Sequence, residues 1–164
     1  MILLIYFSYP RKGLYILGII IALIGEVLRI WATGHLRKNK EVTTTGPYAY
    51  VKNPLYLGTF LIMLGFCIIA RNIYILGIGL AIFLFYYAPY KKKREADRLR
   101  EIFGEKWDDY DKHVPDYIPK LTPYKNRGNN RWNAELVSKN SEIGTLAAVI
   151  AGILLIGLKF LWVG

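Results

Sequence analysis

The sequence predicts an all-α, polytopic integral membrane protein with about four transmembrane helices and a folded cap on the cytosolic side. Three observations predict this class. Hydrophobic residues make up 54% of the 164 residues, more than the roughly 45–50% of soluble chains. The apolar residues gather in four long stretches, and the net charge of +10 is concentrated between them. We expect residues 1–164 to form a single membrane domain.

The four apolar stretches are the expected transmembrane helices, and they cover residues 14–32, 54–70, 73–88 and 143–163. As a helix the first reaches roughly 28 Å, close to the ~30 Å of a bilayer core. The second begins at Pro54, a residue suited to the first turn of a helix. Only Arg71 and Asn72 separate the second stretch from the third, and this short break predicts an antiparallel helical hairpin.

Charge predicts the orientation of these helices. The segments 33–53 and 89–141 hold seventeen Lys and Arg residues, against four that fall on the other side, which are Arg11, Lys12, Arg71 and Lys159. The positive-inside rule therefore places both segments in the cytosol, at the plasma or inner membrane of a prokaryote or the endoplasmic reticulum of a eukaryote. Because acidic residues are interleaved with the cations, we expect anionic membrane lipids and no nucleic acid as partners. With two histidines and one cysteine, we expect no metal site.

A distinctive polar segment precedes the second stretch. Gly46-Pro47 predicts a turn, and the side chain of Asn53 is placed to accept a hydrogen bond from a free amide of the following helix. The same amides form a site suited to an anion. Tyrosines at this entrance offer aromatic faces for a base or a cation: Tyr48, Tyr50 and Tyr56. An interfacial aromatic belt would use the same residues, so the pattern alone leaves both interpretations open.

A second distinctive segment, residues 91–119, directly follows the third stretch. Lys91 and Glu95 are four residues apart and share one helix face. Gly104 is expected to end this helix. The residues beyond it predict a folded cap at the membrane surface, and they are Trp107, Tyr110, Val114-Pro115 and Ile118-Pro119. A solvated basic helix is the simpler interpretation of the charges taken alone.

In this order, the two segments resemble the isoprenylcysteine carboxyl methyltransferase family, within a wider group of integral membrane methyltransferases that includes phospholipid N-methyltransferases. The family element G-x-Y…R-H-P-x-Y-x-G matches Gly46-Pro47-Tyr48 and residues 52–58. The second element is an Arg, a Glu four residues later, F-G, an aromatic residue, Y, V-P and a final P. It matches without a gap Lys91, Glu95, Phe103-Gly104, Trp107, Tyr110, Val114-Pro115 and Pro119. The resemblance covers about residues 25–119.

The resemblance implies that S-adenosyl-L-methionine binds between the loop before the hairpin and the helix after it. The residues at the family's cofactor positions are Lys40, Glu41, Val42, Thr43, Tyr48, Asn53, Pro54, Leu55, Tyr56 and Glu95. Lys91 stands at the position that addresses the substrate and is the implied catalytic residue. Asn53 replaces a His of the eukaryotic enzymes, and Lys91 replaces an Arg. Because lysine lacks the bidentate fork with which arginine binds a carboxylate, the identity of the acceptor stays open.

The implied function is methyl transfer from S-adenosyl-L-methionine to a lipophilic small molecule or prenylated substrate. The first candidate is carboxyl O-methylation of an isoprenylcysteine-like or other lipid acid. N-methylation of a phospholipid or other amine lipid is the alternative, and it needs a proton acceptor, for which Glu95, His113 and Tyr48 are candidates. Two further classes stay open: an NADPH-dependent reductase related to sterol reductases, and a non-catalytic membrane scaffold.

Two charged residues lie inside the first stretch. Glu26 and Arg29 are three residues apart, and ionisable residues in a membrane helix are candidates for function. We expect the two to pair with each other and to hold this helix against the hairpin. His35, just beyond them, is expected to be an interfacial residue rather than a ligand.

Overall fold

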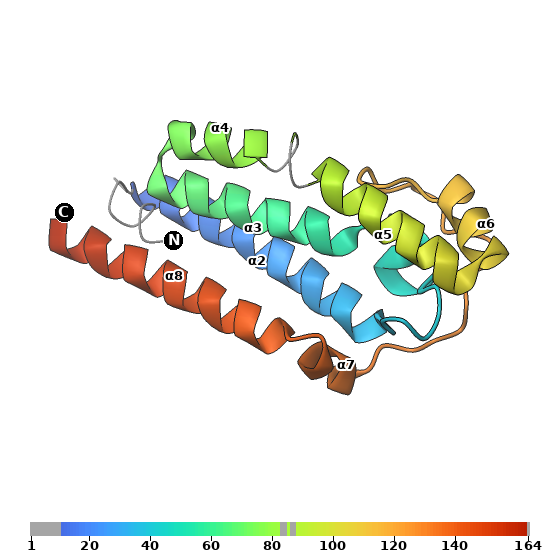
Figure 1. Cartoon of the computed structure of the whole chain (residues 1–164). Coiled ribbons are helices and arrows are strands. Elements are labelled where there is room, and N and C mark those ends of the chain that lie inside the picture. Colours follow the sequence, from blue (N-terminus) through green and yellow to red (C-terminus); the bar gives the residue numbers. More distant parts are fainter. Residues whose placement is uncertain (1–10, 83–84, 86–87, 164) are drawn as a thin grey trace.

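The computed structural model describes residues 11–163, except for 83, 84, 86 and 87. Within these limits the chain forms seven α-helices and one short 3₁₀ helix, and no strand. The all-α prediction is therefore confirmed. Helices α2, α3, α4 and α8 make one elongated end of the molecule, and α5, α6 and their connecting loops make the other (Figure 1).

Helices α2 (Lys12–His35) and α3 (Pro54–Ala70) form a closely packed antiparallel pair. Glycines line their contact. A Cβ atom added to Gly18 would lie 2.5 Å from the carbonyl oxygen of Gly65, and one on Gly25 would lie 2.7 Å from that of Gly58. Small residues that let two backbones approach are typical of helix pairs in membranes.

The predicted hairpin is present. Arg71 ends α3 in the left-handed conformation, with φ 53°, and α4 (Ile73–Ala81) turns back along α3 (Figure 1). The left-handed residue lets the chain reverse while its amide satisfies a terminal helix carbonyl. The expected third span reached residue 88, whereas α4 ends at Ala81. Residues 83, 84, 86 and 87 of that span lie outside the described residues.

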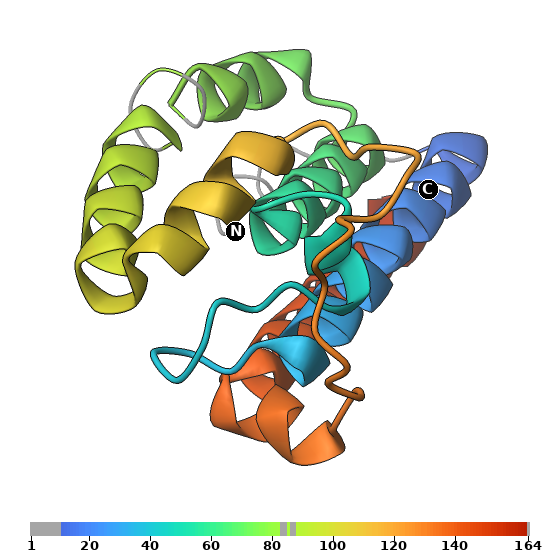
Figure 2. The ribbon, with the colours of Figure 1, turned by 90° about the vertical axis from the view of Figure 1, so that its right-hand side faces the viewer.

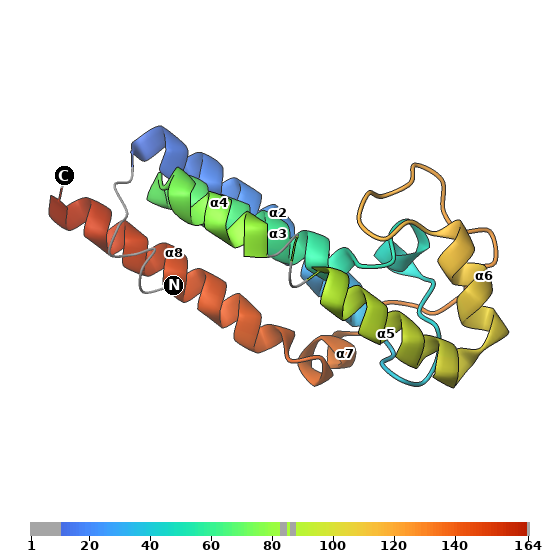
Figure 3. The ribbon, with the colours of Figure 1, turned by 45° about the horizontal axis from the view of Figure 1, so that its top comes forward.

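Helix α8 (Glu142–Val163) lies along α2 and α3 (Figure 3). Apolar side chains of α3 and α8 form the core at this end: Phe66, Ile69, Val149 and Ile156. Helix α2 and the part of α8 up to Lys159 are long and apolar enough to cross a bilayer, and α3 is a shorter apolar helix. Outward-facing side chains such as Val27 and Leu154 are 66% and 60% exposed, as expected of helices that face lipid.

The opposite end is formed by α5 (Ala88–Phe103) and α6 (Glu105–His113). Gly104 separates the two helices with a φ of 54°, so the prediction that it ends the first of them is confirmed. Seen from this end, α5 stands away from α2 and α3, and α6 lies in the space between (Figure 2). The 3₁₀ helix η1 (Gly46–Ala49) lies beside them. Trp107 and Tyr110 of α6 form a small core with Val114.

Residues 114–133, which we call the strap, run from α6 past η1 to α7 (Ala134–Lys139) (Figure 2). Backbone hydrogen bonds attach the strap to the loop between α2 and α3. The amide of Lys52 donates to the Pro115 carbonyl at 2.8 Å, and that of Tyr124 donates to the Ala49 carbonyl at 2.8 Å. The strap therefore fixes the position of the loop that contains the first sequence motif.

The expected pair of Glu26 with Arg29 is wrong. Arg29 instead makes a bidentate contact with Glu142 of α8, with Nε–Oε1 and Nη2–Oε2 distances of 2.7 and 2.9 Å. Its Nη1 atom donates to Thr59 of α3 at 2.6 Å. The paired geometry of guanidinium and carboxylate is stronger than a single contact along one helix. Arg29 thus joins α2 to both α3 and α8.

His35 does not stand at a solvent-exposed interface. Its side chain is buried, and the Nδ1 atom contacts Thr45 Oγ1 at 3.1 Å. A Cβ atom on Gly46, whose φ is 60°, would lie 2.3 Å from the imidazole ring. The turn at Gly46 therefore closes directly onto His35, and the histidine fastens the end of α2 to the loop before α3.

Candidate functional site

A cavity of about 160 Å³ lies between the loop that follows α2, η1, and helices α5 and α6. Residues from both sequence motifs line it. They are Leu36, Arg37, Lys38, Asn39, Glu41, Val42, Thr43, Tyr48, Lys52, Asn53, Glu95, Ala96, Arg98, Leu99, Trp107, Tyr110, Asp111 and Asp116. Segments more than 50 residues apart in the chain thus meet around one space at the polar end of the molecule.

Six of the ten residues expected at a cofactor site line this cavity: Glu41, Val42, Thr43, Tyr48, Asn53 and Glu95. Lys40 is exposed and does not line it, and Pro54 and Leu55 lie in the first turn of α3. Tyr56 stands just outside, where its hydroxyl donates to Glu95 Oε2 at 3.2 Å. Lys91 lies one turn before Glu95 in α5, and its side chain is outside what the structure describes.

Tyr48 is held deep in the lining of the cavity. Its side chain is 7% exposed, and its hydroxyl has no hydrogen-bond partner among the described residues. The backbone carbonyl of Tyr48 accepts a hydrogen bond from Tyr110 at 2.8 Å, which fixes η1 against α6. Burial, and secondly the charge of Glu95, raises the pKa of Tyr48. The phenol therefore stays protonated and acts as a hydrogen-bond donor, so it is a poor proton acceptor.

Trp107 is the second buried polar aromatic residue of the lining. Its side chain is 7% exposed, and Nε1 has no hydrogen-bond partner among the described residues. Its ring packs against that of Tyr110, with centroids 5.7 Å apart. From sequence, Trp107 is expected only as a cap residue and as the aromatic position of the second motif. Its place in the cavity was missed, because nothing local distinguishes a cap aromatic from a ligand-facing one.

The charged residues of the cavity are mostly paired with one another. Lys52 contacts Asp111 at 2.5 Å and Asp116 at 3.0 Å, and Arg37 contacts Glu41 at 3.3 Å. Glu95 is exposed, and its partner among the described side chains is the neutral hydroxyl of Tyr56.

Arg98, also exposed, donates to the neutral amide oxygen of Asn39 at 2.7 Å. Glu95 and Arg98 both belong to α5. This helix therefore gives the cavity one carboxylate and one guanidinium, and neither forms an ion pair with a described side chain.

The predicted side-chain cap by Asn53 is wrong. Asn53 does stand immediately before α3, but its side chain makes no hydrogen bond to the amides of that helix. The amide nitrogen Nδ2 instead donates to the carbonyl of Asp116 in the strap at 3.2 Å. The strap supplies this carbonyl close by, and the amide of Tyr56, which a side-chain cap could bind, instead donates to the backbone carbonyl of Asn53 at 3.1 Å.

The tyrosines at the entrance do not share one environment. Tyr48 lines the cavity, Tyr56 contacts Glu95 at its edge, and Tyr50 is not part of the lining. Of the three candidates for a proton acceptor, His113 also lies elsewhere, with Nδ1 3.2 Å from Asp109. Within the described part of the chain, no three His, Cys, Asp or Glu residues are grouped to hold a metal ion.

The sequence model of the phospholipid methyltransferase family matches residues 13–106, more than half of the chain. The chain belongs to the phospholipid methyltransferase family. This confirms the relationship predicted from the two motifs. The matched region contains the first motif whole, the hairpin and the part of the second motif that includes Lys91 and Glu95.

The curated relatives include proteins named as methyltransferases and proteins named for metal resistance. The protein-S-isoprenylcysteine O-methyltransferases of Dictyostelium discoideum and Xenopus laevis are 30% and 29% identical over 127 and 125 residues. These alignments cover 70% and 68% of this chain and 53% and 43% of the relatives. The nickel-cobalt-cadmium resistance protein NccN of Alcaligenes xylosoxydans xylosoxydans is 31% identical over 112 residues, which are 66% of this chain and 50% of that protein. The chain spans about half the length of these relatives. No solved structure matches it.

Proposed function

We propose that this chain is an S-adenosyl-L-methionine-dependent methyltransferase that modifies a lipophilic acceptor at the cytosolic surface of a membrane. The observation that supports this most directly is the cavity where the two family motifs meet. Six residues at the family's cofactor positions surround it, although they come from the loop before α3 and from α5. Family membership and curated relatives named as methyltransferases support the same reaction class.

The residues of the cavity fit S-adenosyl-L-methionine chemically. Its sulfonium is a cation, and aromatic faces and a carboxylate favour cations. Tyr48 and Glu95 offer both. Buried hydrogen-bond donors on Tyr48 and Trp107 match a ligand rich in acceptor atoms. The volume of about 160 Å³ is below the ~300–1,000 Å³ of sites that enclose a drug-sized ligand. Part of the molecule would therefore lie outside the cavity, near the exposed side chains of α5.

The membrane arrangement that we propose has four spans, at residues 14–32, 54–70, 73–88 and 143–163, with the cavity on the cytosolic side. The polar cofactor would enter from the cytosol. The apolar tail of the acceptor would enter sideways, between helices. Helix α5 begins at Ala88, at the end of the third span, so Lys91 lies where a lipid headgroup reaches the protein.

The cofactor supplies a methyl group on a positively charged sulfur. The protein's main contribution is alignment, because displacement requires the acceptor, the methyl carbon and the sulfur to lie in line. When bound, the cofactor would supply its methyl group to a lone pair of the acceptor, and the electrons of the broken carbon–sulfur bond would stay on sulfur. Tyr48 and Glu95 would orient the cofactor, and Lys91 would hold the polar end of the acceptor.

Carboxyl O-methylation of an isoprenylcysteine-like or other lipid acid is the reaction we favour. A carboxylate is already ionised at neutral pH and needs no base, and a lysine ammonium suits its charge. Amine N-methylation remains the second candidate, because the family as a whole is described by phospholipid substrates. It would require Glu95 to accept the proton, since the pKa of Tyr48 is raised and His113 does not line the cavity.

Two measurements test the proposal. Calorimetry of the purified protein in detergent should show saturable binding of S-adenosylhomocysteine; its absence would favour a scaffold. Membranes that contain the protein should transfer a labelled methyl group from S-adenosyl-L-methionine to lipids, and mass spectrometry should identify an ester or an N-methyl product. Consumption of NADPH in place of methyl transfer would contradict the proposal and indicate a reductase.

A further inference from the structure

The buried polar atoms that have no partner are unevenly distributed. Outside the long apolar helices, and within the described residues, three buried side-chain nitrogen or oxygen atoms lack a hydrogen bond: Arg37 Nε, Tyr48 Oη and Trp107 Nε1. All three residues line the same cavity. Buried polar groups in native proteins are almost always paired, because an unpaired one has lost its water and gained nothing. Of the three, Arg37 Nε still lies 3.3 Å from a carboxylate oxygen of Glu41 and so forms an ion pair.

Side chains of the same types elsewhere in the chain do find partners within the protein. The indole Nε1 of Trp132 donates to the Ile30 carbonyl at 3.2 Å, and the hydroxyl of Tyr110 donates to the Tyr48 carbonyl at 2.8 Å. The fold is therefore able to satisfy a tryptophan at the end of α2 and a tyrosine of the cavity wall. The unpaired donors of Trp107 and Tyr48 are specific to the cavity wall.

The position of Trp107 is fixed by packing. Its ring lies in the core of the cap with Tyr110 and Val114, against which Val42 and Leu99 also pack. An indole N–H can only donate a hydrogen bond, and the hydroxyl of Tyr48 stays protonated because burial raises its pKa. Two residues of the wall thus carry donors without a partner among the described residues, and their natural complement is a ligand group with acceptor atoms, such as a carboxylate or a ring nitrogen.

We infer that Trp107 is a ligand-binding residue whose indole N–H, together with the Tyr48 hydroxyl, donates a hydrogen bond to acceptor atoms of the molecule bound in this cavity. The inference rests on the proposed function for the choice of ligand, S-adenosyl-L-methionine. That ligand has acceptors in its amino-acid part, the carboxylate, and in its adenosine part, the ribose oxygens and the ring nitrogens of adenine.

The test is Trp107→Phe, which removes the N–H and keeps an aromatic ring. Calorimetry in detergent would measure binding of S-adenosylhomocysteine and of 5′-methylthioadenosine, which lacks the amino-acid part. We expect Trp107→Phe to weaken S-adenosylhomocysteine roughly threefold to tenfold, as for one lost hydrogen bond. If 5′-methylthioadenosine weakens equally, the acceptor is in the adenosine part. If only S-adenosylhomocysteine weakens, the acceptor is the carboxylate. Both results support the inference.

Trp132→Phe is the matched control, because it makes the same change where the N–H already has a protein partner. It should leave ligand affinity unchanged and lower the melting temperature of the ligand-free protein. Trp107→Phe should weaken binding, and it should also lower the melting temperature, because the smaller ring leaves a void in the core of the cap. Tyr48→Phe removes only the unpaired hydroxyl, so it should weaken binding with a melting temperature that is unchanged or higher.

Wild-type affinity in both cavity variants would overturn the inference and leave the proposed function intact. The same holds if Trp107→Phe weakens binding while Tyr48→Phe binds as the wild type does, because the loss at Trp107 would then follow from the void in the cap. Absence of ligand binding by the wild-type protein would instead contradict the proposed function, and with it the assignment of the ligand.

Discussion

At the residue scale, the charged side chains that line the cavity differ in whether they form ion pairs. Lys52 is held between Asp111 and Asp116 and so has a structural role. Glu95 contacts a neutral hydroxyl instead. A carboxylate without a matching cation among the described side chains, at the mouth of a cavity, is available for the ammonium, sulfonium or ribose hydroxyls of a ligand.

Glu95→Gln should therefore weaken binding of S-adenosylhomocysteine by roughly tenfold, because a hydrogen bond to a charged group contributes about 1.5–3 kcal/mol. The amide keeps the shape of the side chain, and the protein should still fold in detergent. Glu101→Gln is the control, since it lies on the same helix and is exposed. Equal affinities of the two variants in calorimetry would remove Glu95 from the binding site.

Substitution of Lys91 is expected to impair binding of the acceptor and to leave binding of the cofactor nearly unchanged. Its long stem can lie along apolar surface while its ammonium reaches an anionic headgroup. We expect Lys91→Ala to reduce methyl transfer sharply but to leave S-adenosylhomocysteine affinity within about threefold. Lys91→Arg should keep activity, and should increase it if the acceptor is a carboxylate. Lys92→Ala is the control. If both alanine variants transfer methyl at near wild-type rates, Lys91 serves membrane topology only.

At the scale of elements, one buried ion pair joins α8 to the rest of the membrane helices. The side chains of Arg29 and Glu142 are only 16% and 1% exposed, and Arg29 also contacts Thr59 of α3. Helix α8 lies outside the region matched by the family model. The pair is thus one polar connection, beside the hydrogen bond from the Tyr15 hydroxyl to the Ile153 carbonyl, by which this additional helix is held against α2 and α3.

Glu142→Gln should destabilise the protein strongly, by about 3–5 kcal/mol, because it leaves the charge of Arg29 buried without its counter-ion. Thermal unfolding in detergent would measure the change. Glu135→Gln is the control: its ion pair with Lys139 is exposed, at 3.8 Å, and its loss should cost less than about 1 kcal/mol. Similar melting temperatures for the two variants would show that α8 is held without this ion pair.

The same elements show what the sequence could and could not predict. Helix α3, its hairpin and the end of α5 at Gly104 were predicted correctly, because proline, a two-residue break and glycine are local signals. The partner of Arg29 was not, since Glu142 is 113 residues away while Glu26 stands three residues away on the same helix. The strap was not predicted either, because it is attached largely through backbone hydrogen bonds, which leave little trace in sequence.

In the candidate site, too, features set by local sequence were predicted and long-range side-chain contacts were not. The motifs correctly predicted that the loop before α3 and helix α5 come together, since that depends on the order of the elements. Side-chain orientation was less predictable. The side chain of Asn53 donates to a carbonyl of the strap and does not cap its own helix. Trp107 packs in the core of the cap and also lines the cavity. Both depend on residues that the fold brings close and the sequence separates.

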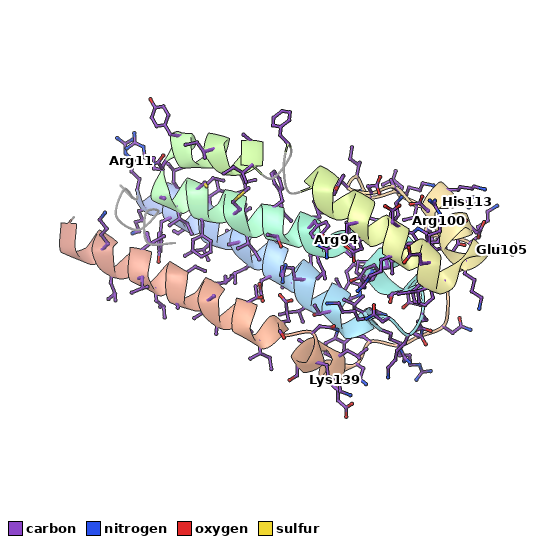
Figure 4. The ribbon with its side chains drawn as sticks, viewed as in Figure 1. Arg11, Arg94, Arg100, Glu105, His113 and Lys139 are labelled. Atoms are coloured by element: carbon purple, nitrogen blue, oxygen red, sulfur yellow. The ribbon has the colours of Figure 1, made fainter. Side chains whose placement is uncertain are left out.

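At the scale of the whole molecule, the charged residues are concentrated at one end of its long axis. Arg94, Arg100, Glu105, His113 and Lys139 lie at the end formed by α5, α6 and α7, whereas Arg11 lies at the opposite end (Figure 4). The segments at the first end hold seventeen of the Lys and Arg residues. The positive-inside rule predicts that this end faces the cytosol, where a soluble cofactor would reach the cavity.

Cysteine labelling tests this orientation directly. The native Cys67 is 3% exposed, so a membrane-impermeant maleimide should leave the wild-type protein unlabelled. In intact bacterial cells that express the protein, Arg11→Cys should react with the reagent, because it lies beyond the non-cytosolic end of α2. Lys139→Cys should react only after the cells are made permeable, because α7 belongs to the cytosolic end. Labelling of Lys139→Cys in intact cells would place the cavity on the outer side, away from cytosolic S-adenosyl-L-methionine. The proposed function would then fail on access alone, however well the cavity bound the cofactor in detergent.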